Sequence, residues 1–189
     1  MGTKELIIQT ADRLLLERGF NAFSYKNIAQ EIAIKTSSIH YHFPTKSDLG
    51  ITLIKRHLAA LEQTIERTAK KSPLEKLQKL LLYYQRLSME NKVCIVGALT
   101  SDINTVEEPM RQELETYANA VVSWAASILD AGQAENVFIT MADSHLKAKM
   151  MVANLMAIVQ ISRIEKNNSS FAPMSKLLLE ELLIKPKTV

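Results

Sequence analysis

The sequence of 189 residues predicts an all-α fold, on three observations. Apolar residues recur at intervals of three and four along most of the chain, which is the spacing of amphipathic helices. No segment shows a convincing alternation of apolar and polar residues, the pattern of a half-buried strand. Five glycines are few for a protein rich in strands and turns. The length allows one large or two small domains.

The N-terminal helices have clear start and stop residues. Gly19 ends a first helix, and Ser24 is a suitable N-cap for the second. Thr45-Lys46-Ser47-Asp48 resembles a capping box and predicts a long helix to about Ala69. The apolar face of the first helix consists of Leu6, Ile7, Ala11, Leu14 and Leu15.

The rest of the chain is predicted to be helical for similar reasons. Ser72-Pro73-Leu74-Glu75 combines a serine cap, a proline at the first helical position and a glutamate at the third. The helices expected from here on run from about Pro73 to Met89, from Thr105–Pro109 to near Gly132, from about Asp143 to Lys166 and from about Ala172 to Leu183.

The segment Phe23 to Gly50 contains the most informative motif. Ala29, Ala33 and Ile39 have the spacing A-x3-A-x5-I, which a helix-turn-helix needs for packing. If the turn requires a positive φ, Ala33 adopts it at some energetic cost. The second helix would present polar and ring side chains to DNA, namely Thr36, Ser37, Ser38, His40, Tyr41 and His42. DNA binding is therefore the leading interpretation.

The surrounding residues, from about 4 to 57, resemble the N-terminal domain of TetR-type transcriptional repressors. A Gly-aromatic pair, Gly19-Phe20, precedes the motif, and the run from His40 to Lys46 is similar to the family's aromatic-x-His-Phe-Pro-x-Lys. Two positions differ, since the family usually has glycine at Ala33 and tyrosine at His40. The resemblance implies a helix-turn-helix domain over residues 1–50 and a helical ligand-binding and dimerisation domain over residues 51–189.

The charge distribution is consistent with DNA binding. Residues 1 to 57 carry eight basic and five acidic side chains, whereas the remainder carries fifteen of each, so the net charge of +3 lies in the first segment. Phosphate neutralisation requires such an excess, although an ordinary solvated surface would also account for it.

We predict base contacts from Thr36, Ser37 and Ser38, because these hydroxyls lie at the start of the recognition helix. The complete predicted DNA-binding set is Ser24, Tyr25, Lys26, Lys35, Thr36, Ser37, Ser38, His40, Tyr41, His42 and Lys46. Tyr41, His42 and Lys46 are expected to hold phosphates, together with Tyr25 and Lys26 at the start of the preceding helix and Lys35 near the turn. The helix N-termini at Ser24 and Thr45 are expected to add backbone N–H donors.

The last two helices have broad apolar faces, which favour a homodimer over a simple buried core. The resemblance implies that these helices form a four-helix bundle between two protomers. It also implies a pocket for an unidentified small-molecule effector. The predicted ligand-binding residues are Tyr83, Cys94, Tyr117, Trp124, Met151 and Asn154. Plain core packing is the alternative for each of them, and Trp124 and Asn154 are singled out because a buried indole or amide needs a polar partner.

Cys94 is the single cysteine, which excludes an internal disulfide framework and fits a reducing cytoplasm. It lies between predicted helices and close to Lys92, so a lowered pKa would make it a reactive thiolate. The alternatives are therefore a repressor released by electrophiles or oxidants at Cys94, and an inert buried cysteine.

Other functional classes are disfavoured. The chain has no cluster with zinc-ligand spacing, no Gly-rich phosphate loop and no nucleophile elbow, so we expect a protein without catalytic residues, metal or cofactor. No stretch approaches a membrane span of about 20 apolar residues, and balanced charges on the first helix disfavour a membrane-surface role. A helical small-molecule-binding protein that no longer binds DNA remains an alternative, although Lys26, Lys35, Tyr41, His42 and Lys46 are retained. The expected function is a ligand-responsive cytoplasmic repressor that binds a palindromic operator in double-stranded DNA.

Overall fold

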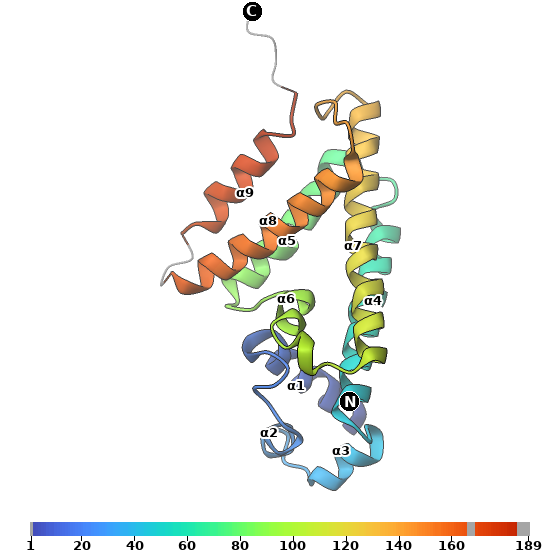
Figure 1. The fold of residues 1–189 in the computed structure, drawn as a ribbon, viewed down its shortest axis with the longest axis vertical. Coiled ribbons are helices and arrows are strands. Elements are labelled where there is room, and N and C mark those ends of the chain that lie inside the picture. The colour runs from blue at the N-terminus through green and yellow to red at the C-terminus, as the bar shows by residue number, and fades with distance from the viewer. Residues whose placement is uncertain (1, 166–168, 185–189) are drawn as a thin grey trace, which may run out of the picture. The chain divides into compact units, whose positions relative to one another are not determined.

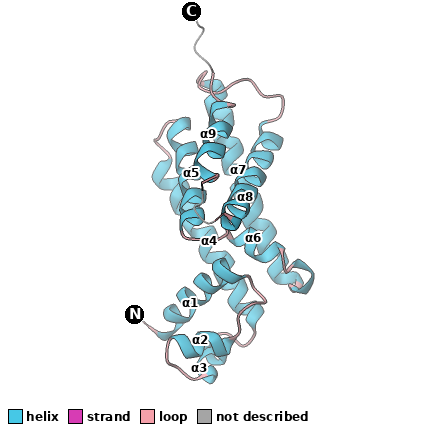
Figure 2. Ribbon diagram, turned by 90° about the vertical axis from the view of Figure 1, so that its left-hand side faces the viewer, coloured by secondary structure: helices cyan, strands magenta, loops and turns pink. Residues whose placement is uncertain are grey.

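The computed structural model describes residues 2–165 and 169–184 (Figure 1). Within this part the regular elements are helices, apart from one isolated antiparallel bridge between Phe138 and Leu183 (Figure 2). The helices are α1 (Thr3–Arg18), α2 (Tyr25–Glu31), α3 (Thr36–His42), α4 (Lys46–Thr68), α5 (Pro73–Met89), α6 (Ile95–Thr100), α7 (Glu108–Ala134), α8 (Ser144–Ile164) and α9 (Phe171–Glu180), with a 3₁₀ turn at Ile103–Thr105. The all-α prediction is confirmed.

The chain forms two compact units, each made of two segments. Unit 1 comprises Met1–Glu62 and Val93–Ala118, and unit 2 comprises Gln63–Lys92 and Asn119–Val189. Helices α4 and α7 have residues in both units. The predicted boundary after residue 50 does not coincide with this division, because residues 93–118 form part of the same unit as the N-terminal helices.

Unit 1 is built around α1, which contacts α2, α3 and α6. The apolar face predicted for this helix is buried at Ile7, Ala11 and Leu15. Gly19 ends α1 as predicted, with a φ of 91° and its N–H donating to the carbonyl of Leu15. The later segment joins this core directly, since the Val93 N–H donates to the Leu16 carbonyl at 3.0 Å.

Unit 2 contains α5, α8 and α9, which contact one another pairwise. The predicted capping box at the start of α5 is present. The Ser72 N–H donates to a Glu75 carboxylate oxygen at 3.0 Å, and the Glu75 N–H donates to the Ser72 hydroxyl at 3.3 Å. The hydrogen bond from the Ser72 backbone, aided by Lys71, lowers the pKa of Glu75 to about 2. Asp143 caps α8 by accepting the Leu146 N–H at 2.8 Å.

Two elements differ from the sequence prediction. Helix α6 was not predicted, and Cys94 is its N-cap rather than part of a break between helices. Helix α7, by contrast, starts at Glu108, within the segment Thr105–Pro109 that was expected to open it. Helix α9 ends at Glu180, before the backbone of residues 182–184 pairs with residues 137–139. The predicted end of α8 at Lys166 lies outside the described residues.

Candidate nucleic-acid interface

Helices α2 and α3 form the predicted helix-turn-helix. Ile28, Ala29 and Ile39 are buried between the helices and the rest of unit 1. The turn between them contains Ala33, whose φ of 54° lies in the left-handed region. The N–H of Ile34 donates to the Ala29 carbonyl at 3.0 Å and closes the turn. Ala33 therefore adopts the positive φ considered for this turn, at the energetic cost expected of a residue with a Cβ.

Helix α3 presents most of its predicted side chains to solvent. Ser37, His40 and Tyr41 are exposed, and Thr36, Ser38 and His42 are partly exposed. The Tyr41 side chain is 82% exposed, although a phenol ring is usually at least half-buried in a folded protein. Lys26 on α2 and Lys35 at the N-cap of α3 are also exposed. These residues together form a polar surface with two cations and an aromatic ring available to a partner.

Tyr25 does not belong to this surface. It is buried, and its hydroxyl donates to the carbonyls of Phe43, at 2.9 Å, and of Thr45. Burial and the nearby charge of Asp48 raise the pKa of Tyr25 to about 12. The prediction that Tyr25 contacts a phosphate is therefore corrected: the side chain fastens the start of α2 to the connection between α3 and α4.

Lys46 also has a different position from the one predicted. Its ammonium donates to the carbonyls of Phe20 and Phe23 and lies over both aromatic rings. Burial lowers the pKa of Lys46, and the charge of Asp102 opposes this effect. In this structure the lysine holds the loop between α1 and α2, so its expected contact with a phosphate is not available without rearrangement.

The helix N-termini at Ser24 and Thr45 are capped by side chains. The Ser24 N–H and hydroxyl both donate to Asn27 Oδ1, at 2.8 and 2.7 Å. The Thr45 N–H and hydroxyl donate to Asp48 Oδ2, at 2.9 and 2.8 Å. A neighbouring carboxylate at Thr45 and an amide oxygen at Ser24 therefore occupy the N–H and hydroxyl donors of these two cap residues.

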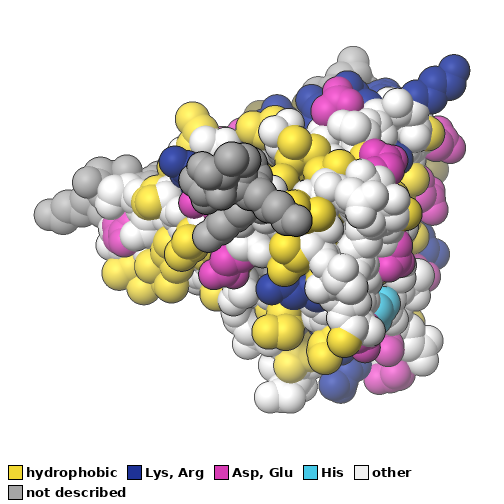
Figure 3. All heavy atoms as spheres, turned by 90° about the horizontal axis from the view of Figure 1, so that it is seen from above, with side chains coloured by type: hydrophobic (Ala, Val, Ile, Leu, Met, Phe, Trp, Pro, Cys, Tyr) yellow, Lys and Arg dark blue, Asp and Glu magenta, His cyan; other side chains and the backbone are white. Residues whose placement is uncertain are grey.

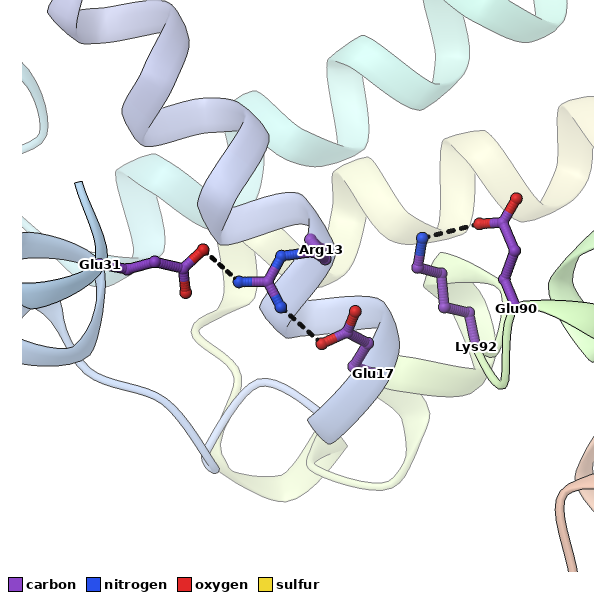
Figure 4. Close-up of polar contacts among 5 residues, drawn as sticks. All are labelled: Arg13, Glu17, Glu31, Glu90 and Lys92. Carbon is purple, nitrogen blue, oxygen red and sulfur yellow. Dashed lines mark hydrogen bonds and ion pairs between the residues drawn. The ribbon is translucent and has the colours of Figure 1, made fainter.

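An ion-pair cluster not anticipated from the sequence links α1 to α2. Arg13 donates to Glu17 at 2.7 Å and to Glu31, the last residue of α2 (Figure 4). The hydrogen bond to Glu31 raises the pKa of Arg13. Because Glu31 lies two residues before Ala33, the cluster restrains the turn of the helix-turn-helix.

Cys94 is buried, and its thiol accepts the Gly97 N–H at 3.4 Å at the start of α6. Burial raises the pKa of Cys94, despite the opposing effect of backbone N–H groups. The expected lowering by Lys92 is not found, because that ammonium pairs with Glu90 at 2.7 Å (Figure 4). The thiol is therefore protonated and shielded in this conformation.

The other predicted ligand-binding residues are divided between the two units. Tyr117 is buried in unit 1, with its ring against His57. In unit 2, Trp124 and Met151 are buried and Tyr83 is partly exposed. Asn154 is exposed, so it is not the buried amide that the sequence suggested.

Unit 2 contains a groove between α5 and α9 with a volume of about 340 Å³. It is lined by Gln78, Leu81, Leu82, Gln85, Phe171, Ala172, Ser175, Lys176 and Leu179. None of the predicted ligand-binding residues is among them. No sequence pattern marked this groove, because most of its lining consists of ordinary helix-surface residues.

Exposed apolar side chains are frequent on α8 and α9, and hydrophobic side chains are visible on the face drawn in Figure 3. The large exposed ones on these two helices are Leu146, Met150, Ile161, Ile164, Met174 and Leu177. In the described part of the chain, no helix is long and apolar enough to cross a membrane. The same residues contain no group of three His, Cys, Asp or Glu side chains suited to holding a metal ion.

Comparison with known proteins agrees with this geometry. The sequence model of a family described as bacterial regulatory proteins, tetR family, matches residues 7–50. The chain is 26% identical to the HTH-type transcriptional repressor NemR of Escherichia coli, covering 93% of this chain and 90% of that protein. Two solved structures are also similar. A TetR-family regulator from Agrobacterium tumefaciens has a TM-score of 0.89 at 25% identity, covering 96% of this chain and 97% of that one.

The second structure, a TetR regulator from Legionella pneumophila, has a TM-score of 0.86 at 27% identity, covering 96% of this chain and 98% of that one. Both the helix-turn-helix segment and the complete fold therefore have counterparts among bacterial regulators. The segment matched by the family sequence model contains α2, α3 and the turn at Ala33. By sequence over residues 7–50 and by fold along most of its length, this chain is similar to TetR-family transcriptional regulators.

Proposed function

We propose that the protein is a homodimeric, cytoplasmic transcriptional repressor that binds a palindromic operator in double-stranded DNA and is released by a small-molecule effector. The exposure of Tyr41 is the observation that most supports this proposal. Its ring is 82% exposed at the end of a short helix whose opposite face is anchored by the buried Ile39. A helix of this kind can enter a major groove with its first residues at the base edges.

The proposed contacts follow from the exposed positions on and near α3. Thr36, Ser37 and Ser38 lie in its first turn, where hydroxyl groups can donate to or accept from base edges. The phosphate backbone of the DNA would be held by Lys26, Lys35, Tyr41 and His42 and, in a peripheral position, by His40. This division predicts that lysine substitutions weaken binding to all sequences, whereas substitution of Ser37 changes the preference among operators.

Dimerisation through α8 and α9 is supported by their exposed apolar side chains. Six large hydrophobic residues on two helices exceed the scattered exposure normal for a monomer, and covering them would remove that area from water. Two protomers would also supply the two recognition helices that a palindromic site requires, about 34–36 Å apart.

Release by an effector would follow from linkage between two sites. An effector that binds the C-terminal domain better in the arrangement incompatible with DNA weakens DNA binding by the same factor that DNA weakens effector binding. Tyr83, Trp124 and Met151 remain candidates for its pocket, because they combine apolar surface with an indole N–H and a phenol. The name of the E. coli relative, a repressor, supports repression over activation.

The test is fluorescence anisotropy of the purified protein on labelled DNA flanking its own gene, with scrambled DNA of equal length as the control. Tight binding to the flanking DNA, with two protomers per site, supports the proposal. Lys26→Ala and Lys35→Ala should each reduce the slope of log affinity against log salt by about one. Weak binding that is equal on scrambled DNA contradicts it and favours a helical binding protein without DNA recognition.

Release by modification of Cys94 is a second candidate, favoured by one observation. The thiol caps α6 from a buried position, so a substituent on sulfur would have to displace the packed start of this helix. Addition to an electron-poor alkene would form an S–C bond, and the thiol proton would end on the adjacent carbon. If Cys94→Ser still binds DNA but is no longer released by such a reagent, this candidate replaces the effector. Unchanged release excludes it.

A further inference from the structure

The loop between α1 and α2, residues 19–24, is held by a segment distant in sequence. The Asn21 N–H donates to Asp102 Oδ2 at 2.9 Å, and its side-chain amide donates to the Thr105 hydroxyl at 2.8 Å. The Thr105 hydroxyl in turn donates to the Asp102 carbonyl at 2.8 Å. The backbone and side chain of one loop residue are thus both bound to the turn that follows α6.

The same loop is held by α4. The Lys46 ammonium donates to the carbonyls of Phe20 and Phe23 and lies 4.5 and 4.4 Å from the centroids of their rings. The negative charge of Asp102 favours the charged form of Lys46 and partly offsets the effect of burial on its pKa. Asp102 therefore holds the loop directly, through its hydrogen bond with Asn21. It also acts electrostatically, because its charge favours the charged form of Lys46, which binds the loop near both ends.

Close packing at Gly50 adds a third contact. A methyl group at Gly50 on α4 would lie 2.3 Å from the Met110 sulfur and 3.2 Å from the Phe20 ring, so these groups already touch the backbone of α4. Residues 102–110 consequently meet both α4 and the α1–α2 loop within unit 1. The loop has little freedom to move independently of them.

We propose that Asp102 is a positioning residue for DNA binding, which fixes the α1–α2 loop and thereby the orientation of α2 and α3 without touching DNA. The inference rests on the proposed function for its effect on affinity. Its structural basis is that the loop joins directly to Ser24, the N-cap of α2. Releasing Asn21 lets the start of the helix-turn-helix shift relative to α4, and a small misplacement of a recognition helix costs base contacts.

The effect on affinity distinguishes positioning from simple electrostatics. Removing a carboxylate from a DNA-binding unit reduces repulsion of phosphates, so charge alone predicts tighter binding for Asp102→Ala. Positioning predicts the opposite, a loss of about tenfold on the operator, equivalent to about 1.4 kcal/mol. The matched control is Glu115→Ala, which removes the same charge from an exposed position of unit 1 on α7. It should bind as tightly as the wild type or more tightly.

Two further variants separate positioning from general destabilisation. Asp102→Asn keeps an oxygen acceptor for the Asn21 N–H and should lose less than about threefold in affinity. It removes the charge, so the pKa of Lys46, followed by NMR of its side chain, should fall below the wild-type value. Thr105→Val removes the hydroxyl acceptor of the Asn21 side chain without changing any charge, and should weaken operator binding by about threefold.

Amide hydrogen exchange at Asn21 provides a readout that does not depend on DNA. The exchange should be slow in the wild type and Asp102→Asn, and faster in Asp102→Ala. Operator affinity unchanged in folded Asp102→Ala and Thr105→Val, or tightened as in Glu115→Ala, overturns the positioning role. If the wild type binds no DNA, the proposed function fails, and equal exchange in all variants then overturns the loop contact as well. If Asp102→Ala does not fold, Thr105→Val binding like the wild type is sufficient to reject the proposal.

Discussion

The Lys46 ammonium lies 4.4 Å from the centroid of the Phe23 ring while it donates to the carbonyl of the same residue. A cation is thus bound by a residue's main chain and side chain together. It stands at the first residue of α4, so it joins that helix to the loop before α2. The arrangement explains why a lysine placed beside a recognition helix in the sequence is not free for a phosphate.

Lys46→Met should lower the free energy of unfolding by about 1–3 kcal/mol, because two half-buried carbonyls lose a charged donor. The slope of log affinity against log salt should not change. Urea unfolding and anisotropy over a salt series measure both quantities. The control is Lys26→Met on the exposed side of α2, for which stability should stay within about 0.5 kcal/mol and the slope should fall by about one. A slope reduced by one in Lys46→Met would restore its role at a phosphate.

Ala33→Gly should stabilise the protein by about 0.5 kcal/mol. The left-handed conformation costs a residue with a Cβ about 1–2 kcal/mol, and glycine loses part of this gain through the entropy of the unfolded chain. Urea unfolding at neutral pH measures the change. Ala59→Gly, at an exposed position inside α4, is the control and should destabilise by about 1 kcal/mol. A loss of stability in both variants would show that the turn at Ala33 is not strained.

The buried phenol of Tyr25 should contribute to the free energy of unfolding, and this contribution should be lost at alkaline pH. Its pKa is raised from 10.0 to about 12 on folding, so the contribution is complete below pH 10 and disappears as the pH rises through 12. A shift of this size corresponds to at most about 2.7 kcal/mol. Urea unfolding at pH 9 and pH 11.5 should show a smaller decrease for Tyr25→Phe than for the wild type.

Tyr41→Phe is the control, because that ring is exposed and should leave the alkaline decrease unchanged. Lys46, whose pKa is lowered, contributes in the opposite sense in this range, but it is present in all three proteins and cancels in the comparison. An equal decrease in the wild type and Tyr25→Phe would contradict a buried phenol at this position.

Cys94 should react slowly with a thiol reagent such as 5,5′-dithiobis(2-nitrobenzoate). Its side chain is buried and its pKa is raised, so both access and thiolate concentration are low. At neutral pH, the rate should be below about one hundredth of the rate for the urea-unfolded protein. Reaction as fast as in the unfolded protein would instead support release through Cys94.

Leu177→Glu should convert the proposed dimer to monomer, because it places a charge on the apolar surface of α9. Sedimentation velocity at micromolar concentration measures the change. Leu82→Glu is matched in residue type and exposure, 52% against 57%, but lies on α5 and should leave the dimer intact. Monomer formation by both variants, or by neither, would contradict an interface formed by α8 and α9.

The features predictable from the sequence were those fixed by neighbouring residues. The cap at Ser72, the end of α1 at Gly19 and the turn at Ala33 depend on residues within a few positions, and each was found as expected. Helix α6 could not be predicted, because four of its six residues are buried and a short buried helix has no amphipathic period.

The candidate site was predictable only in part, for a related reason. The exposed face of α3 follows from the spacing of Ala29, Ala33 and Ile39. Tyr25 and Lys46 were expected at phosphates, but in the structure both donate to backbone carbonyls of distant residues, and no side-chain pattern marks a carbonyl acceptor. Asp102 was missed because a single aspartate beyond the motif has no signature until folding brings it to Asn21.

The discontinuous composition of unit 1 has a practical consequence for protein engineering. Cutting the chain after Glu62 would separate α1 from Val93 and α6, and would expose part of its buried face. A chimaera that exchanges the helix-turn-helix with that of a TetR-family regulator should therefore transplant residues 93–118 together with the N-terminal helices. Grafting the contiguous N-terminal segment alone would pack its helices against residues 93–118 of a different protein.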